Sequence, residues 1–343
     1  MTNTPNILIV YTGGTIGMVK DYKTGALKAF DFSQISSKIP ELQQLNCSIS
    51  TISFDEPIDS SNMNVNYYVK IAEIISENYE EYDGFVVLTG SDTMSYTSSA
   101  ISFMFENLQK PIIFTGSQLP IGDLRTDAKE NLITSIQVAS ANKKGVPIIQ
   151  EVGLYFEYKL YRANRTTKIN ADQFEAFASM NYPPIAESGV HLNFNHPLLL
   201  KPKLNESKLV FRKKLDNNVA ILKLFPGITE AVVRSFINIP NIKGIVLETY
   251  GSGNAPTEKW FINLLEEAIA KNIYIVNVTQ CTGGSVILGH YETSSDLKRI
   301  GVVGGKDITT ETAVAKMMYL IGEKLPKEDF KRYFETSLRG EIG

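Results

Sequence analysis

The chain has 343 residues, of which 43% are hydrophobic and 21% are charged, and its formal net charge is −3. Its length suggests about two domains, and the small charge gives no basic surface that would favour nucleic acid or a membrane as a partner. The sequence contains no apolar run as long as a membrane-spanning helix and leaves no room for a signal peptide before its first expected strand. It has only two cysteines, which fits a reducing compartment, so we expect a cytoplasmic protein.

Residues 6–10 (NILIV) are apolar and β-branched, which predicts a buried parallel strand. The next motif, residues 11–17 (YTGGTIG), requires a sharp turn, which its two adjacent glycines allow. This turn puts the Thr15 hydroxyl at the carboxyl end of the strand, where open α/β sheets bind ligands. Glycine-rich turns often hold phosphate, but the G-x-G-x-x-G spacing and a P-loop Lys-Ser/Thr pair are absent. A nucleophilic or hydrogen-bonding threonine is the better interpretation.

A polar loop at residues 19–28 follows, and then a helical segment that ends near Leu45. Such a loop, with Tyr22 in it, either acts as a lid or is a plain surface excursion. Alternation predicts a strand at residues 48–54. The motif DSSNM at residues 59–63 then supplies more short polar side chains than one helix cap needs, which favours contact with a ligand.

Three more strands are expected to end in polar loops: residues 83–88 before TGSDT (89–93), 111–115 before GSQ (116–118), and 147–155 before NRTTK (164–168). Helices are expected at 65–78, from the TGSDT loop through Asn107, and at 126–142. This alternation predicts βαβ units and mainly parallel sheets, whose strands share one carboxyl edge. We therefore expect Thr15, Ser60, Ser91 and Asp92 to converge on one cleft.

Residues 197–218 are rich in Lys, Leu and Asn and contain two prolines, which is typical of an interdomain connector. We expect a larger N-terminal catalytic α/β domain at residues 1–200, a connector at 201–218 and a smaller C-terminal α/β domain at 219–343. In the second domain we expect strands at 219–224, 243–248 and 273–277, and helices at 229–237, 257–271 and 310–325.

The three histidines lie outside these loops, which disfavours a Ser-His-Asp triad: His191, His196 and His290. No metal-binding signature is present, so we expect neither a metal nor another cofactor. A lysine kept neutral by its surroundings can also activate a hydroxyl, and Lys168 is a candidate for this role. The alternative is that Lys168 is an ordinary surface lysine.

Seven motifs in a fixed order carry a resemblance that covers nearly the whole chain: YTGGTIG (11–17), DSSNM (59–63), TGSDT (89–93), GSQLP (116–120), NRTTK (164–168), GSGNAP (251–256) and LRGE (338–341). With these motifs the chain resembles the cytoplasmic (type I) bacterial L-asparaginases of the asparaginase/glutaminase family. The resemblance implies two α/β domains, an active site at the carboxyl ends of the N-domain strands, and a homodimer or homotetramer in which a neighbouring subunit completes the site.

The resemblance also implies the chemistry. Thr15 attacks the side-chain amide carbon of L-asparagine, and an acyl-enzyme intermediate leads to L-aspartate and ammonia. Ser91, Asp92 and Lys168 form a second group that assists proton transfer. Asp92 also binds the α-ammonium group of the substrate.

Three further substrate-binding residues are implied in the same way: Ser60 and Ser61 for the α-carboxylate, and Asn254, contributed by a neighbouring subunit. A mixed glutaminase-asparaginase is an alternative, because one methylene gives only about 1–3 kcal/mol of discrimination. An archaeal subunit that supplies ammonia for tRNA amidation is also similar, but it carries an extra N-terminal domain. A non-catalytic amino-acid-binding module is the alternative from another class.

The chain departs from the family pattern at three places. Position 91 is most often threonine in the family, whereas here it is Ser91. The tyrosine of the lid aligns with Ala26 or Leu27, and Tyr22 is displaced from it. Some type I relatives have a second, regulatory asparagine site in which an arginine binds the effector, and Glu248 takes its place here. This change predicts that the effector site is lost; the alternative is a remodelled site in which Glu248 pairs with Arg162 or Arg165.

Overall fold

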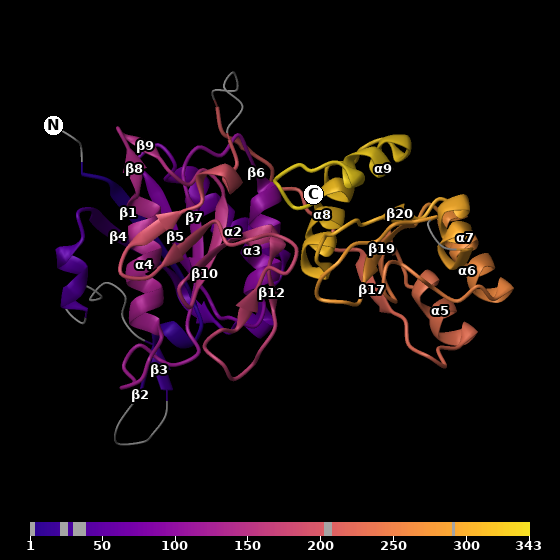
Figure 1. The fold of residues 1–343 in the computed structure, drawn as a ribbon, viewed down its shortest axis with the longest axis horizontal. Coiled ribbons are helices and arrows are strands. Elements are labelled where there is room, and N and C mark those ends of the chain that lie inside the picture. The colour runs from indigo at the N-terminus through magenta and orange to yellow at the C-terminus, as the bar shows by residue number, and fades with distance from the viewer. Residues whose placement is uncertain (1–3, 21–26, 30–38, 202–207, 290–291) are drawn as a thin grey trace. The chain divides into compact units, whose positions relative to one another are not determined.

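The computed structural model describes residues 4–20, 27–29, 39–201, 208–289 and 292–343. The chain divides into two compact units, residues 1–213 and 214–343 (Figure 1). The lid positions Tyr22 and Ala26 lie outside the described residues, as does His290.

The first unit is built on an eight-stranded sheet in the order β15-β14-β11-β10-β7-β5-β1-β4. Strands β4, β1, β5, β7 and β10 run parallel, and β10, β11, β14 and β15 pair antiparallel at one edge. The bounds are β1 (Asn6–Gly13), β4 (Ser48–Ile58), β5 (Gly84–Leu88), β7 (Ile112–Thr115), β10 (Val152–Phe156), β11 (Lys159–Arg162), β14 (Ala186–Ser188) and β15 (Leu192–Phe194).

The described part of this unit also contains three α-helices, four two-stranded ladders and several short 3-10 helices. The helices are α2 (Val65–Glu77), α3 (Met94–Met104) and α4 (Ala128–Ser140). The ladders pair β2 (Met18–Lys20) with β3 (Leu27–Ala29), β6 (Phe105–Glu106) with β16 (Val210–Phe211), β8 (Asn142–Lys143) with β9 (Val146–Pro147), and β12 (Thr167–Lys168) with β13 (Phe177–Ala178).

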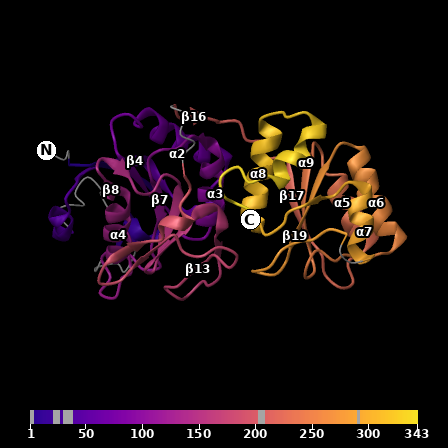
Figure 2. The same cartoon turned by 45° about the horizontal axis from the view of Figure 1, so that its top comes forward.

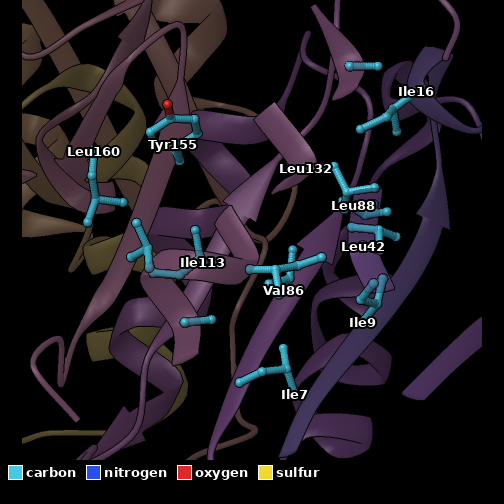
Figure 3. Packing of buried hydrophobic residues seen from close by; sticks show 14 of the residues in the cluster. Ile7, Ile9, Ile16, Leu42, Val86, Leu88, Ile113, Leu132, Tyr155 and Leu160 are labelled. Carbon is cyan, nitrogen blue, oxygen red and sulfur yellow. The ribbon is translucent and has the colours of Figure 1, made fainter. Parts of the chain in front are cut away.

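The central strands are apolar because both of their faces are covered. Every residue of β5 and β7 is buried, and so is all of β1 after its first residue. Figure 3 shows Ile7, Ile9, Val86 and Ile113 of these strands in one packed cluster with Leu132 of α4. This rigid layer fixes the strand ends from which the polar loops emerge.

Several predicted element bounds were wrong. The helix predicted through Asn107 ends at Met104, because Phe105 leaves the helix and pairs with Phe211. The strand predicted to begin at residue 147 begins at Val152. The helical segment near Leu45 is, in its described part, a short 3-10 helix, Pro40–Gln44.

The second unit has a parallel four-stranded sheet, with α8 and α9 on one side and α5, α6 and α7 on the other (Figure 2). The strands are β17 (Val219–Lys223), β18 (Gly244–Thr249), β19 (Tyr274–Thr279) and β20 (Val303–Gly304). The helices are α5 (Glu230–Ile237), α6 (Lys259–Ala270), α7 (Glu292–Ile300), α8 (Thr310–Gly322) and α9 (Lys327–Glu335). Helices α7 and α9 and strand β20 were not predicted.

The LRGE motif is explained by a buried ion pair in this unit. The Glu341 carboxylate accepts hydrogen bonds from the backbone N–H groups of Leu338 and Arg339 and pairs with Lys316 of α8 at 2.5 Å. Both charged side chains are fully buried. The motif therefore has a structural role that fastens the segment after α9 to α8.

Candidate active site

The site in the first unit begins where three loops pack backbone against backbone. Strand β1 lies between β4 and β5, so the loops after these three strands emerge side by side. A Cβ atom on Gly13 would collide with the backbone of Ile58, and one on Gly14 with the backbone of Gly90. Both Gly13 and Gly14 have positive φ angles, 133° and 87°, which other residues rarely adopt. Glycine is therefore needed here both for the turn and for the close approach of the loops.

Thr15 opens a 3-10 turn, Thr15–Gly17, with its side chain partly exposed. The Gly17 N–H donates to the Gly14 carbonyl at 3.2 Å, and the buried Tyr11 hydroxyl donates to the Gly17 carbonyl at 3.3 Å. Burial raises the pKa of Tyr11 to about 12, so this hydroxyl keeps its proton. The turn is thus stabilised by a backbone hydrogen bond and by Tyr11, without the Thr15 hydroxyl.

Residues 59–64 use their polar side chains in three ways. Asp59 accepts hydrogen bonds from the backbone N–H and the hydroxyl of Ser61, both at 2.8 Å, and these bonds lower the pKa of Asp59. Helix α2 is capped separately by Asn64, whose side chain accepts from Asn66 N at 3.0 Å. Ser60 is buried, with its side chain against Gly90. Because the Ser61 hydroxyl donates to Asp59, it has to turn before it can donate to a ligand.

Lys168 joins two side chains of the TGSDT loop. Its Nζ donates to Ser91 Oγ at 2.9 Å and to Asp92 Oδ1 at 2.7 Å. The Lys168 side chain is only 17% exposed, so it is not the ordinary surface lysine of the alternative interpretation. The Asp92 side chain is 67% exposed, and solvent screens this ion pair. The pair therefore adds little stability, but it fixes an amine beside a hydroxyl and a carboxylate.

The segment that carries Lys168 is held by buried hydroxyls of α3. Thr166 Oγ1 is hydrogen-bonded to Ser95 Oγ at 3.1 Å, and Asn164 Nδ2 donates to Ser102 Oγ at 3.2 Å. These contacts explain the polar composition of α3, which is buried along its whole length except at Tyr96. They place Lys168 against the loop that precedes the same helix.

Gln118 is a polar residue of the site for which no role was predicted from the sequence. Its Oε1 accepts from Ser91 Oγ at 3.3 Å, and its Nε2 donates to the carbonyls of Ala171 and Gln173 at 3.0 and 2.9 Å. The sequence signal that could have revealed its role is its position directly after β7, in the third of the hydroxyl-rich loops that follow strands. The side chain links the Ser91 loop to the turn that follows Lys168.

The other candidates lie elsewhere. Asn254 belongs to the second unit, in a turn after β18 where it exchanges backbone hydrogen bonds with Tyr250 at 2.8 and 2.9 Å. His191 and His196 are both exposed, near edge strand β15. The first unit therefore brings together Ser91, Asp92 and Lys168 by direct contact and the loops of Thr15 and Ser60 by backbone packing.

Glu248 has partners other than the arginines proposed for it. Thr310 Oγ1 donates to its carboxylate at 2.6 Å, and Lys223 Nζ lies 3.4 Å from it. Arg162 instead forms a buried ion pair with Glu151 at 2.5 Å, and Arg165 stacks on the ring of Tyr182. These are contacts within each unit, and the pairing of Glu248 with Arg162 or Arg165 stays a prediction.

Among the described residues, no group of three or more His, Cys, Asp or Glu side chains is arranged to hold a metal ion. Within the same part of the chain, every helix is too short or too polar to cross a bilayer.

Comparisons with known proteins give a consistent result. The family model "Asparaginase, N-terminal" matches residues 6–200, and "Glutaminase/Asparaginase C-terminal domain" matches residues 218–334. The chain is 41% identical over 339 residues to L-asparaginase 1 of Escherichia coli (strain K12), covering 98% of both chains. It is 37% identical to the 60 kDa lysophospholipase of Mus musculus, with 98% of this chain and 62% of that protein covered. The crystal structure of L-asparaginase I from Vibrio cholerae superposes with a TM-score of 0.90 at 36% identity, over 99% of this chain and 100% of that one.

Proposed function

The chain belongs to the asparaginase family, and on that premise we propose that it hydrolyses the side-chain amide of L-asparagine to L-aspartate and ammonia. The observation that carries the proposal is the contact of Lys168 with both Ser91 and Asp92, on loops that share an edge of the sheet with Thr15. Amide hydrolysis needs a nucleophile and a proton carrier, and these residues are suited to both roles.

In the proposed reaction, the Thr15 hydroxyl oxygen bonds to the amide carbon of the substrate. The carbon–nitrogen bond breaks, the nitrogen takes up a proton and ammonia leaves, so that Thr15 carries the aspartyl group as an ester. Water then attacks the ester carbon, and Thr15 regains its proton as aspartate leaves. Ser91 and Lys168 carry protons in these steps, and backbone N–H groups of the loops stabilise the negative oxygen.

The α-carbon end of the substrate requires charge complementarity. The Asp92 carboxylate is exposed enough to meet an α-ammonium group, and Ser60 and Ser61 are proposed to receive the α-carboxylate. Asn254 is proposed to reach the site from a neighbouring subunit of a homodimer or homotetramer, as the family resemblance implies. We also propose a cytoplasmic location, in keeping with the type I resemblance.

Ammonia release from L-asparagine by the purified protein is the direct test, with L-glutamine measured in parallel. Rapid release from asparagine supports the proposal, and comparable rates with both amides would indicate the mixed glutaminase-asparaginase. Binding of asparagine without ammonia release would indicate the binding module instead.

For the assembly, activity and molecular mass are followed together on dilution, and a fully active monomer would contradict the role of Asn254.

A further inference from the structure

We propose that Gln118 is a positioning residue for the Ser91 hydroxyl, and that the chain depends on it because residue 91 is a serine. The proposal rests on the asparaginase activity proposed above, in which Ser91 carries a proton. It goes beyond that activity by assigning a task to a residue outside the reacting group.

The orientation of the Gln118 amide is fixed by its two donor contacts. Its Nε2 donates to the carbonyl oxygens of Ala171 and Gln173, at 3.0 and 2.9 Å. If the amide were flipped, its oxygen would face two other oxygens and lose both hydrogen bonds. The amide oxygen therefore points to Ser91 Oγ, 3.3 Å away.

This orientation decides where the Ser91 proton lies. An amide oxygen only accepts hydrogen bonds, so the Ser91 hydroxyl must donate to Gln118. The lone pairs of Ser91 Oγ are then left for Lys168 Nζ, which donates to it at 2.9 Å. Gln118 thus keeps the serine oxygen turned toward the lysine with which it exchanges protons.

Serine needs this help more than threonine would. The two heavy atoms on the Cβ of threonine restrict its χ1 angle, whereas the single Oγ of serine is free to occupy any of the three staggered positions. A hydrogen bond to another side chain can restrict the χ1 angle of serine as the methyl group restricts that of threonine. Among the described residues, Gln118 accepts the hydrogen bond that Ser91 donates, while Lys168 donates to the same Oγ.

Gln118 is held in place independently of Ser91. Its backbone N–H donates to Asp127 Oδ2 at 2.9 Å, and Leu119 N donates to Asp127 Oδ1 at 3.1 Å. Asp127 is buried and also accepts from Asn131 Nδ2 at 3.2 Å. The amide is therefore presented to Ser91 from a fixed backbone.

The test is a cycle of four proteins: the parent, Gln118→Met, Ser91→Thr and the double variant. We expect Gln118→Met to lower kcat for L-asparagine about threefold to tenfold when residue 91 is serine, the range for loss of one hydrogen bond. In the Ser91→Thr background the same change should lower kcat less than about twofold. KM should change little in either case. Gln137→Met on the exposed face of α4 is the matched control and should leave kcat unchanged.

An equal fall of kcat in both backgrounds would overturn the proposal, because Gln118 would then act only through the turn at residues 170–173.

High-resolution crystal structures give a readout that does not depend on activity. Ser91 should occupy several rotamers in Gln118→Met and one in the parent; a single unchanged rotamer in both would overturn the proposal. A parent that releases no ammonia would refute the proposed function alone, and the rotamers would still decide the role of Gln118. If Gln118→Met does not fold, Gln118→Asn, which is one methylene too short, takes its place.

Discussion

The Thr15 side chain projects from a turn that other residues stabilise. Gly14 and Gly17 close the turn by a backbone hydrogen bond, and Tyr11 supports it from the core. We therefore expect Thr15→Ala to lower kcat about 10⁴-fold or more, as for removal of a nucleophile, with almost no change in the unfolding temperature. Ammonia release and thermal unfolding of the same sample are the measurements. Activity within tenfold of the parent, at an equal unfolding temperature, would remove Thr15 from the nucleophile role.

Ser91 and Lys168 are expected to act as one unit, because their side chains share a hydrogen bond on the proposed proton path. Groups that act together lose most of their joint effect when either is removed. Ser91→Ala, Lys168→Met and the double variant should therefore show similar losses of kcat. If the losses add in log kcat, the two residues work separately.

At the residue scale, the sequence allowed the polar residues of the site to be proposed but not the contacts between them. Thr15, Ser91 and Lys168 stand in recognisable motifs, and their roles stay predictions. The role of Gln118 was missed because it depends on an amide that reaches across 27 residues to Ser91 and across 53 and 55 residues to Ala171 and Gln173. Spacing along the chain carries no information on such contacts.

At the scale of elements, the hairpin between β10 and β11 turns through Glu157 and Tyr158, both with positive φ angles, 45° and 67°. Two-residue hairpin turns favour Asn-Gly, which is absent here, so neither this hairpin nor the antiparallel edge beyond it could be predicted from the sequence. The parallel strands β5 and β7 were predicted because their apolar runs reflect burial on both faces. Edge strands of three or four residues leave no comparable pattern.

The same turn makes stability depend on pH. Burial, followed by the charges of Asp127, Glu130 and Glu175, raises the pKa of Glu157 from 4.5 to about 7. An acid with a higher pKa in the folded state favours folding when protonated, so its contribution is full below pH 4.5 and is lost as the pH rises through 7. Solvent reaches part of the carboxyl group, which limits the loss to roughly 1–2 kcal/mol.

We therefore expect Glu157→Gln to raise the free energy of unfolding at pH 8 by about 1–2 kcal/mol, and to have little effect at pH 4.5. Urea unfolding at the two pH values measures the difference. Glu187→Gln on the neighbouring strand β14, where the side chain is exposed, is the matched control. Equal effects of Glu157→Gln at both pH values would show that the carboxyl group does not titrate in this range.

At the scale of the whole molecule, Glu248 bears on regulation. In the regulatory site of some type I relatives, an arginine at this position binds the effector, and such an arginine–carboxylate hydrogen bond contributes about 1.5–3 kcal/mol. In this chain the position is Glu248, whose carboxylate accepts a hydrogen bond from Thr310 and pairs with Lys223. A loss of about 3 kcal/mol weakens effector binding by roughly two decades. Cooperativity needs an effector that binds one state better than another. We therefore expect the initial rate to depend hyperbolically on asparagine concentration. A Hill coefficient clearly above one that disappears in Glu248→Ala would instead reveal a remodelled site.

The wide separation of contacting residues along the chain also has a consequence for folding. Lys168 and Ser91 are 77 residues apart, and β1 pairs in parallel with β4 and β5, which requires long crossovers to close first. Contacts of this kind make folding slow, whereas helices form locally and fast. In a refolding experiment the far-ultraviolet signal of the helices should therefore return early. Catalytic competence should return last, when the strand ends that carry the loops have come together.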